Sequence, residues 1–437
     1  MEKTLLAGYG ITNITPDFDV CLSGYGRDEQ RHAEGVEHDI FTTCVAVSDG
    51  EKTILMVTND VISTEVETTF RLKEEISQAT GIPEDRVYIS NTHSHSTTRV
   101  AMNSKIPGTE QFRQLVFAKA IEAAKAALGD LAPAGMWIGD QQLYHMAFVR
   151  HWLMKDGTYY GPNFGSIKSG FVGHATKADE TLMMIRFSRE NKQDILMVNW
   201  QAHPANSRRI GFQLISPDYV GIVRDRLAEK TGALIHYLPG ASGNQICRSS
   251  WEEEHNNLNW DEYGEKLAEY ALELLPKLEP VNGIGIENTR IIYPARTNHA
   301  DEDKLEEARE VSKVFREQGI EEGNKLARSY GFTSVYHAGS VLSRPSLGET
   351  SPLDMNAFRI GDVGFITGTW EMASTTGISV RENSPFRYTA ILCGNSRYVP
   401  AYAAYLYGSY ESSNTIYAQG TAEEVSQKYM EMLFKVR

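Results

Sequence analysis

The sequence predicts an α/β fold in which mixed β-sheets are sandwiched by α-helices. The main observation is an alternation along the chain, in which short apolar, β-branched runs are separated by longer segments with apolar residues at helical intervals. The second is composition, because 41% hydrophobic and 23% charged residues in a chain of 437 are typical of an ordinary globular enzyme or binding protein. A chain of this length can bury a large core, and we expect residues 1–437 to form a single domain.

The N-terminal third predicts a β-α-β unit. Residues 41–47 and 53–58 alternate like a hairpin around Asp49-Gly50. Residues 65–80 have apolar side chains at helical spacing and end at Gly81-Ile82-Pro83, so a helix should return the chain to a buried strand over 87–89. The expected strand runs directly into a histidine-containing loop.

The rest of the chain continues the alternation, with one change in composition. We expect residues 5–27 to hold a strand and a loop rich in Gly, Asp and Pro. We expect helices over 111–128, 217–231 and 260–275, and strands over 141–150, 181–187, 195–200, 233–238, 284–293, 357–369 and 388–392. Charged residues dominate 301–329 while the apolar positions keep a helical period, which predicts a solvated helical insertion over the core within about 298–345. The glycine-rich stretch 157–173 is expected to line a site or form a surface hairpin, and the tyrosine-dense stretch 398–417 to be a loop.

The charge of the chain excludes some classes of partner. A net charge of −14 argues against nucleic acid and against an anionic membrane surface, which basic patches usually meet. Four widely spaced cysteines are too few for a disulfide scaffold, and no window approaches the 18 apolar residues of a membrane span. The first residues also lack the apolar segment of a signal peptide. We therefore expect a cytoplasmic protein that does not insert into a membrane; a homo-oligomer is left open.

The first candidate site is the pair His93 and His95, which follow the expected strand over 87–89. Side chains two residues apart on an extended backbone point the same way, and neutral imidazole is a common zinc ligand. A polar turn of hydrogen-bonded histidines explains the pair equally well. A hydrolytic zinc site takes three or four nitrogen and oxygen ligands, and further candidates at strand ends are His203, Glu371 and Tyr398. Taken singly, these three fit a turn histidine, a surface charge and a packed aromatic residue.

The order of these motifs resembles the neutral, non-lysosomal ceramidase family. The likeness begins at Ala7-Gly8-Tyr9-Gly10-Ile11-Thr12-Asn13-Ile14-Thr15-Pro16 and Gly24-Tyr25-Gly26, and covers nearly the whole chain. Asn91-Thr92-His93-Ser94-His95-Ser96 is similar to the family's Thr-His-Thr-His-Ser-Gly motif, and Asn199-Trp200-Gln201-Ala202-His203-Pro204 resembles the stretch with its second zinc histidine. We identify the chain as a divergent member that corresponds to the N-terminal catalytic domain.

The resemblance implies a role for each matched residue. It implies Zn²⁺ as cofactor, with His93, His203, Glu371 and Tyr398 as ligands. It implies that His95 handles a proton or faces the substrate. Tyr410, twelve residues after Tyr398 and followed by Glu411, would contact the reacting group, and Arg150 would support the site.

The chain also departs from the family pattern. The family places a serine in a Gly-Asp-x-Ser-Pro-Asn motif, and the matching turn here, Gly243-Asn244-Gln245-Ile246-Cys247, has Ile246 at that position. An offset alignment would bring Ser242 there but breaks the glycine match. Thr97-Thr98 replaces the usual Gly-Pro, and the chain stops soon after the tyrosine loop, where the family carries a C-terminal β-sandwich.

These observations lead to one functional hypothesis and two alternatives. We expect a zinc-dependent hydrolase that attacks an amide bond of a small polar or glycan-derived substrate with a metal-activated water. Asn244 in the small-residue turn, and the aromatic rings of Trp152 and Tyr402, are candidates for substrate contact. The first alternative is a zinc enzyme that cleaves an ester or glycosidic bond, or rearranges a sugar-like substrate. The second is a non-catalytic metal-binding or ligand-binding protein.

Overall fold

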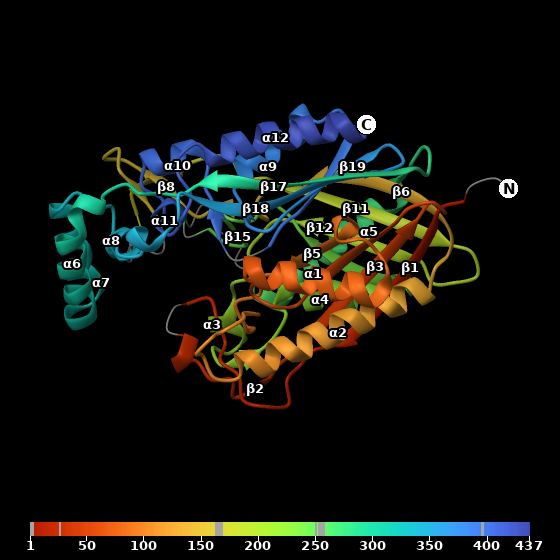
Figure 1. The fold of residues 1–437 in the computed structure, drawn as a ribbon, viewed down its shortest axis with the longest axis horizontal. Coiled ribbons are helices and arrows are strands. Elements are labelled where there is room, and N and C mark those ends of the chain that lie inside the picture. Colours follow the sequence, from red (N-terminus) through yellow and green to blue (C-terminus); the bar gives the residue numbers. More distant parts are fainter. Residues whose placement is uncertain (1–3, 26–27, 162–168, 250, 252–257, 395–396) are drawn as a thin grey trace.

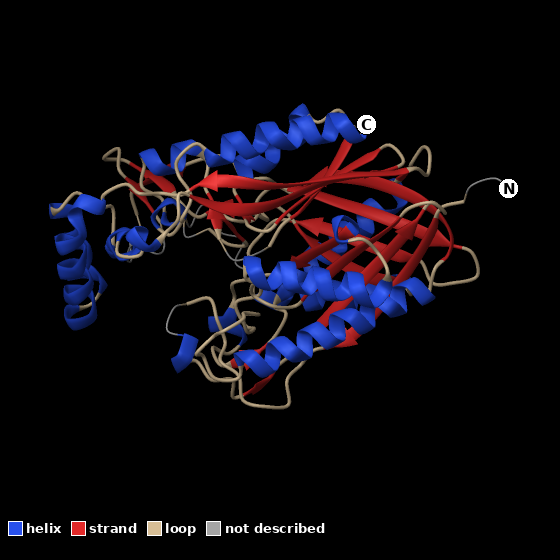
Figure 2. Ribbon diagram, viewed as in Figure 1, coloured by secondary structure: helices blue, strands red, loops and turns tan. Residues whose placement is uncertain are grey.

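The structure is a computed structural model, and it describes residues 4–25, 28–161, 169–249, 251, 258–394 and 397–437. Its α/β architecture is the predicted one, with mixed sheets between layers of helices (Figures 1 and 2). Gly26 of the N-terminal motif and residues 162–168 of the glycine-rich stretch lie outside the described residues.

Within the described residues, one large sheet is built from nine strands. Their order is β14 (Leu234–Pro239), β12 (Ile195–Trp200), β11 (Thr181–Arg189), β6 (Ala132–Gln142), β1 (Leu6–Asn13), β3 (Phe41–Ser48), β4 (Thr53–Asn59) and β5 (Val87–Asn91), with β16 (Glu279–Pro280) paired to β6. The predicted β3–β4 hairpin is antiparallel, and β4 pairs in parallel with β5. The helix α1 (Val66–Thr80) joins these two parallel strands and ends at Gly81, whose φ is 75°. The β-α-β unit is therefore confirmed.

A second sheet packs on the first and completes the core. It consists of β17 (Ile286–Arg296), β18 (Thr350–Ile360), β19 (Val363–Gly368) and β21 (Tyr388–Leu392). Tyr88 of β5 stacks on Phe358 of β18 with 4.2 Å between ring centroids, and both side chains belong to one buried apolar cluster shared by the two sheets. Burial of such rings is worth about 1.5–3 kcal/mol each, so this contact fixes the two sheets face to face.

Helices cover the outer faces of both sheets. Figure 1 shows α12 running along the second sheet, and α1 and α2 along the opposite side of the molecule. The longer helices are α2 (Thr109–Gly129), α4 (Tyr219–Thr231), α5 (Trp260–Leu274), α6 (Leu305–Gln318), α7 (Ile320–Ser329), α9 (Ser374–Asn383) and α12 (Thr421–Val436). The short helices are α3 (Ser207–Ile210), α8 (Val335–Val341), α10 (Tyr402–Leu406) and α11 (Tyr410–Ser413).

The large sheet curls, so that β14 crosses strands that lie far from it in the sheet order. The hydroxyl of Tyr9 in β1 donates to the carbonyl of Ile235 in β14 over 2.8 Å. The buried imidazole of His236 lies 2.9 Å from the hydroxyl of Thr43 in β3 and 3.3 Å from that of Thr58 in β4. Because β14 is parallel to β12, and β4 to β5, the curl brings the carboxyl ends of β12 and β5 to one place. His203 and His93 follow these two strand ends.

Small ladders shape the loops at this end of the sheets. They are β10 (Phe171–His174) with β8 (Trp152–Met154) and β9 (Tyr159–Tyr160), β2 (Gly35–Val36) with β13 (Leu214–Ile215), β7 (Phe148–Val149) with β15 (Gln245–Ile246), and β20 (Glu371–Met372) with β22 (Tyr398–Val399). The ladder of β20 and β22 is parallel and pairs Glu371 directly with Tyr398. Two of the predicted metal ligands are therefore neighbours.

Several elements differ from the sequence prediction. The strand expected over 141–150 does not form: β6 ends at Gln142, β7 covers only Phe148–Val149, and residues 143–147 between them are not in a strand. Most of β6 lies before the predicted range, where Pro133, Gly135 and Gly139 interrupt the alternation in the sequence. The tyrosine-dense stretch contains α10 and α11 rather than only a loop. Helices α9 and α12 were not predicted; α9 starts with Ser-Thr-Thr, which has little intrinsic helix propensity.

The charged segment forms helices as predicted, with an apolar centre of its own. Helices α6, α7 and α8 enclose a small buried cluster that includes Ala308, Val311, Phe332 and Val341. Figure 1 shows α6 and α7 at one end of the molecule, beyond the sheets, rather than over their faces. Within the described residues, no helix is both long enough and apolar enough to cross a membrane.

Candidate metal centre

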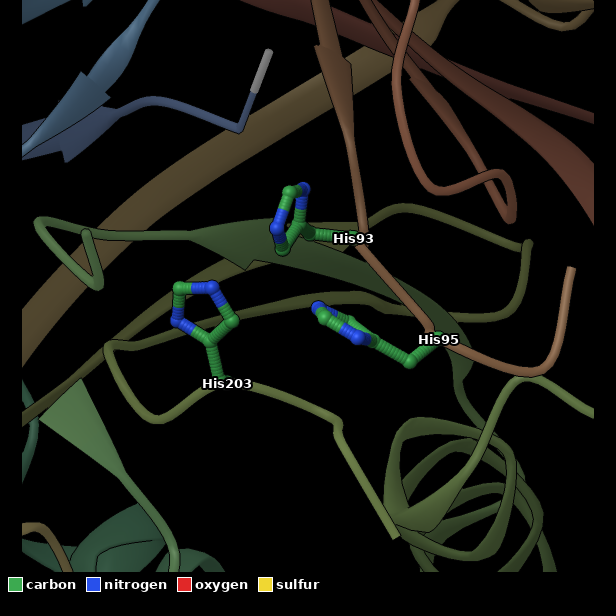
Figure 3. Close-up of side chains that lie close together, drawn as sticks. All are labelled: His93, His95 and His203. Atoms are coloured by element: carbon green, nitrogen blue, oxygen red, sulfur yellow. The ribbon is translucent and has the colours of Figure 1, made fainter. Parts of the chain in front are cut away.

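Three histidines converge where β5 and β12 end. Figure 3 shows the rings of His93, His95 and His203 turned toward a common space. The ring centroids of His93 and His203 are 4.6 Å apart, and that of His95 lies 5.3 and 5.6 Å from them. One nitrogen of each ring lies within 4.8 Å of one from the other two. Within the described residues, no hydrogen bond reaches Nδ1 of His93 or either ring nitrogen of His95, which favours a metal site over a hydrogen-bonded polar turn.

The carboxylate of Glu371 faces two of these rings. Its Oε2 atom lies 3.5 Å from Nε2 of His93 and 3.3 Å from Nε2 of His203. These separations are long for hydrogen bonds. A tetrahedral zinc with ligands at about 2.0–2.1 Å separates its ligand atoms by about 3.4 Å. Oε2 and Nε2 of His203 are also buried with no hydrogen-bond partner within the described chain. This set of donor atoms therefore fits a zinc ion.

Each histidine is held in position by its backbone or by its second ring nitrogen. His203 Nδ1 lies 2.7 Å from the carbonyl oxygen of Ser242 and donates to it, which leaves Nε2 as the lone-pair nitrogen. His93 has a left-handed backbone with φ of 67°, and its N–H donates to the carbonyl of Val61 over 3.1 Å. A non-glycine residue in this region costs about 1–3 kcal/mol and is often found at functional sites.

His95 lies beneath the Gly24-Tyr25 turn. A Cβ atom on Gly24 would come within 2.5 Å of Nδ1 of His95, so only glycine admits the ring there. The ring of Tyr25 meets that of His95 edge-on at 5.2 Å. The buried guanidinium of Arg31 donates from Nη1 to the carbonyl of His95 over 2.6 Å. The glycine and tyrosine of the N-terminal signature therefore shape the position of His95.

An arginine and a glutamate organise the tyrosine side of the site. Arg150 Nε lies 2.6 Å from Oε1 of Glu411, and its Nη2 donates to the carbonyl of Gly243 over 3.0 Å. The guanidinium carbon lies 5.5 Å from the ring centre of Tyr398 and 5.2 Å from that of Tyr410. Both members of the ion pair are buried, so the pair is a strong constraint on the two rings.

Burial sets the protonation preferences of these groups when no cation is bound. It lowers the pKa of His93 to about 4 and that of His203 to about 3, so both imidazoles are neutral and able to bind a metal. Burial raises the pKa of Glu371 to about 7, although His93, Arg150 and a hydrogen bond from Tyr398 oppose the shift. A buried carboxyl group of this kind requires a positive partner to ionise fully at neutral pH. Burial also raises the pKa of Tyr410 to about 12, so its hydroxyl stays protonated.

Comparison with known proteins places the chain in a family. A model of the N-terminal part of the neutral/alkaline non-lysosomal ceramidases matches residues 5–237, which is more than half of the chain. The chain belongs to this family. The match includes His93, His95, Arg150 and His203 and ends before Glu371, Tyr398 and Tyr410. The fold, rather than the matched sequence, brings Glu371 to His93 and His203. Tyr398 pairs with Glu371 in the β20–β22 ladder, and Tyr410 packs beside Arg150.

Solved ceramidases share the fold. A ceramidase complexed with C2 aligns with a TM-score of 0.73 at 16% identity, over 100% of this chain and 76% of its own. The neutral ceramidase from Pseudomonas aeruginosa aligns with a TM-score of 0.72 at 15% identity, over 99% of this chain and 74% of its own. At these identities the likeness concerns architecture, which agrees with the predicted ceramidase-like catalytic fold.

The three residues that were predicted to contact substrate in this ceramidase-family chain have other contacts in the structure. Trp152 is fully buried in an aromatic cluster with Phe171 and Tyr160. Tyr402 is half exposed on α10, and its backbone N–H donates to Glu423. Asn244 uses its side-chain oxygen to accept the Ser374 N–H over 2.8 Å. The packing thus gives Trp152 and Asn244 structural contacts, and the contacts of Tyr402 do not include the histidines.

Sequence reasoning missed three supporting residues: Gly24, Arg31 and Gln245. The buried side chain of Gln245 donates to the carbonyls of Gln201 and Ala241 and accepts the Asp179 N–H, which holds the turn beside His203. Arg31 has no sequence motif that could have indicated its bond to His95. Gly24 lies in the Gly24-Tyr25-Gly26 motif, but its contact with His95 joins chain segments that are 71 residues apart.

Ser242 contacts the metal centre through its backbone carbonyl and not through its hydroxyl. The atom that contacts His203 is the carbonyl oxygen, and this atom remains in Ser242→Ala. We expect turnover by the variant to stay within about twofold of wild type, as for most substitutions that touch no special contact. Steady-state kinetics measures this. A collapse of activity with the fold intact would instead assign the hydroxyl a catalytic role and favour the offset alignment.

Proposed function

We propose that the chain is a zinc-dependent hydrolase that cleaves an amide bond in a small polar or glycan-derived compound. One observation carries the proposal: Nε2 of His93, Nε2 of His203 and Oε2 of Glu371 converge with separations of 3.3 and 3.5 Å from the carboxylate. Tyr398, paired with Glu371 in the β20–β22 ladder, is the fourth proposed ligand. Zinc held there supplies the acidification of water and the polarisation of a carbonyl group that amide hydrolysis needs.

The surrounding residues have distinct proposed roles. Ser242 orients His203 through the bond to Nδ1. His95 presents ring nitrogens with no hydrogen bond from the described residues, and it accepts and returns the proton that moves during cleavage. The protonated hydroxyl of Tyr410 donates a hydrogen bond to the oxygen on which negative charge develops.

Arg150 is proposed as a positioning residue. Its guanidinium is already engaged by Glu411 and by the Gly243 carbonyl, so it acts on the substrate through the tyrosines that it holds. This assignment agrees with the supporting position that the family resemblance implies for Arg150. Tyr398 and Tyr410 then keep fixed orientations during the reaction.

Family membership supports the choice of an amide bond. The named substrate of the ceramidases is ceramide, which is an N-acyl compound and therefore an amide. The net charge of −14 disfavours approach to an anionic lipid surface, which supports a polar substrate rather than a membrane lipid. The type of bond that is cleaved and the class of substrate can therefore be tested separately.

A panel of substrates with one shared reporter group tests the reaction class. Zinc-loaded protein is offered N-acyl, O-acyl and glycosyl derivatives of the reporter, together with an N-acylsphingosine in detergent. We expect the polar N-acyl compounds to be cleaved fastest, with activity lost on chelation and restored by zinc. Preference for the O-acyl or glycosyl compounds would favour the sugar-directed alternative. Protein that binds no zinc and turns over no compound would favour a non-catalytic protein.

A further inference from the structure

A cavity of about 210 Å³ lies between the helical segment α6–α8 and the tyrosine segment α10–α11. It has room for about seven waters at about 30 Å³ each. Most of its lining residues carry a polar side chain, and they come from four stretches that are distant in sequence. The lining residues that matter here are Asn298, Asp301, His337, Arg344, Ser412 and Ser413.

The guanidinium of Arg344 is incompletely compensated in this wall. Its residue is 2% exposed, and its Nε–H donates to no acceptor within the described chain. Nη1 donates to the carbonyl of Ala300. The nearest carboxylate oxygen is Oδ2 of Asp301, at 3.8 Å from Nη1. A buried guanidinium whose anion is distant is costly, so a closer anionic acceptor in the cavity would be favoured.

Asp301 only partly serves as that anion, because closer groups already engage both of its carboxylate oxygens. Its Oδ1 lies 2.8 Å from Nζ of Lys304, and its Oδ2 lies 3.2 Å from Nε2 of His337. Lys304 also lies over the ring of Phe332 at 5.7 Å. Burial lowers the pKa of His337 to about 4, so its ring is neutral. The Asp301 carboxylate is therefore shared between the charges of Lys304 and Arg344, and it is the more distant partner of Arg344.

We propose that this cavity binds a small ligand through a phosphate-type oxyanion, with Arg344 as its principal contact. A guanidinium matches the oxygens of such an anion in both geometry and charge. The hydroxyl-bearing wall adds neutral contacts for the rest of the ligand. Within that wall the hydroxyls of Thr333 and Ser413 lie 3.1 Å apart and join the helical segment to α11.

Occupancy of the cavity would reach the metal centre through α11. Ser412 and Ser413 line the cavity, and the same short helix carries Tyr410 and Glu411, which belong to the metal centre. Gly408 allows the close approach of this segment to the helices, since a Cβ there would lie 2.3 Å from Cγ2 of Thr333. A bound oxyanion thus restrains the helix that positions two residues of the site. This last effect on turnover rests on the proposed function, whereas binding does not.

Isothermal titration calorimetry of the full chain with inorganic phosphate, at fixed ionic strength, tests the site. Asn298→Asp is the informative variant, because Oδ1 of Asn298 accepts the Ala300 N–H over 3.0 Å and a carboxylate can keep that bond while placing a negative charge in the wall. We expect one phosphate per wild-type chain, an affinity at least about tenfold weaker in Asn298→Asp and in Arg344→Gln, and no change in the exposed control Arg296→Gln.

The outcomes separate the possibilities. Sulfate should compete with phosphate, and chloride at the same ionic strength should not. Absence of saturable binding to wild type, or wild-type affinity in both cavity variants, would overturn the proposal. If Arg344→Gln does not fold, Asn298→Asp decides the question alone. Phosphate binding without any substrate turnover would leave the oxyanion site standing and count against the proposed hydrolase.

Discussion

Replacing His203 with alanine is expected to abolish zinc binding and to lower kcat/KM by more than about a thousandfold, which is about 4 kcal/mol of transition-state stabilisation. The side chain is fully buried, and its Nε2 lies 3.3 Å from Glu371. Its removal takes away one of the proposed ligands and leaves a cavity that water can enter. Zinc content by mass spectrometry and steady-state kinetics measure the two effects.

The control for this variant is His32→Ala. The ring of His32 is about half exposed and pairs with Asp19 at 3.0 Å. It should retain wild-type zinc content and activity. Circular dichroism should show that both variants are folded. If His203→Ala still bound about one zinc per chain and kept activity within tenfold of wild type, His203 would not be a ligand.

Glu411→Gln is expected to cost stability and turnover together while zinc stays bound. The substitution leaves the buried guanidinium of Arg150 without its carboxylate, which usually costs about 3–5 kcal/mol of unfolding free energy. Freed from Glu411, Arg150 no longer holds Tyr398 and Tyr410 in place. We expect kcat to fall about 10- to 100-fold, the range seen when partners of site residues are removed, with little change in KM.

Urea denaturation and kinetics on the zinc-loaded variant measure these effects. Glu431→Gln is the matched control, because Glu431 forms an exposed pair with Lys428 on α12, and such pairs are worth about 0–1 kcal/mol. A merely structural role for Glu411 would lower stability and leave kcat unchanged. Loss of zinc from Glu411→Gln would instead show that the ion pair supports the ligands themselves.

Sequence reasoning could predict the fold class and the two histidine positions because both depend on local patterns. The apolar runs before His93 and before His203 are strands, and polar residues that follow buried strands lie at a sheet edge. Nothing local, however, indicates that these two edges meet. That depends on the curl of the large sheet, which Tyr9 and His236 secure by bonds between distant strands.

The contacts made by backbone atoms could not be predicted. The carbonyl of Ser242 orients His203, so a residue considered for its hydroxyl matters through an atom that every residue has. Trp152 shows the converse, since an aromatic residue suited to stacking on a sugar is instead fully buried. Residue type predicts which contacts a side chain is able to make, while packing decides which of them forms.

Anomalous diffraction from crystals of zinc-loaded protein at the zinc absorption edge tests the proposed metal centre most directly. We expect one strong peak per chain within about 2.0–2.2 Å of Nε2 of His93, Nε2 of His203 and a carboxylate oxygen of Glu371, with the ring nitrogens of His95 farther away. A peak bound by all three histidines and not by Glu371 would contradict the assignment of the ligands. Absence of any peak among these residues would contradict the metal centre itself.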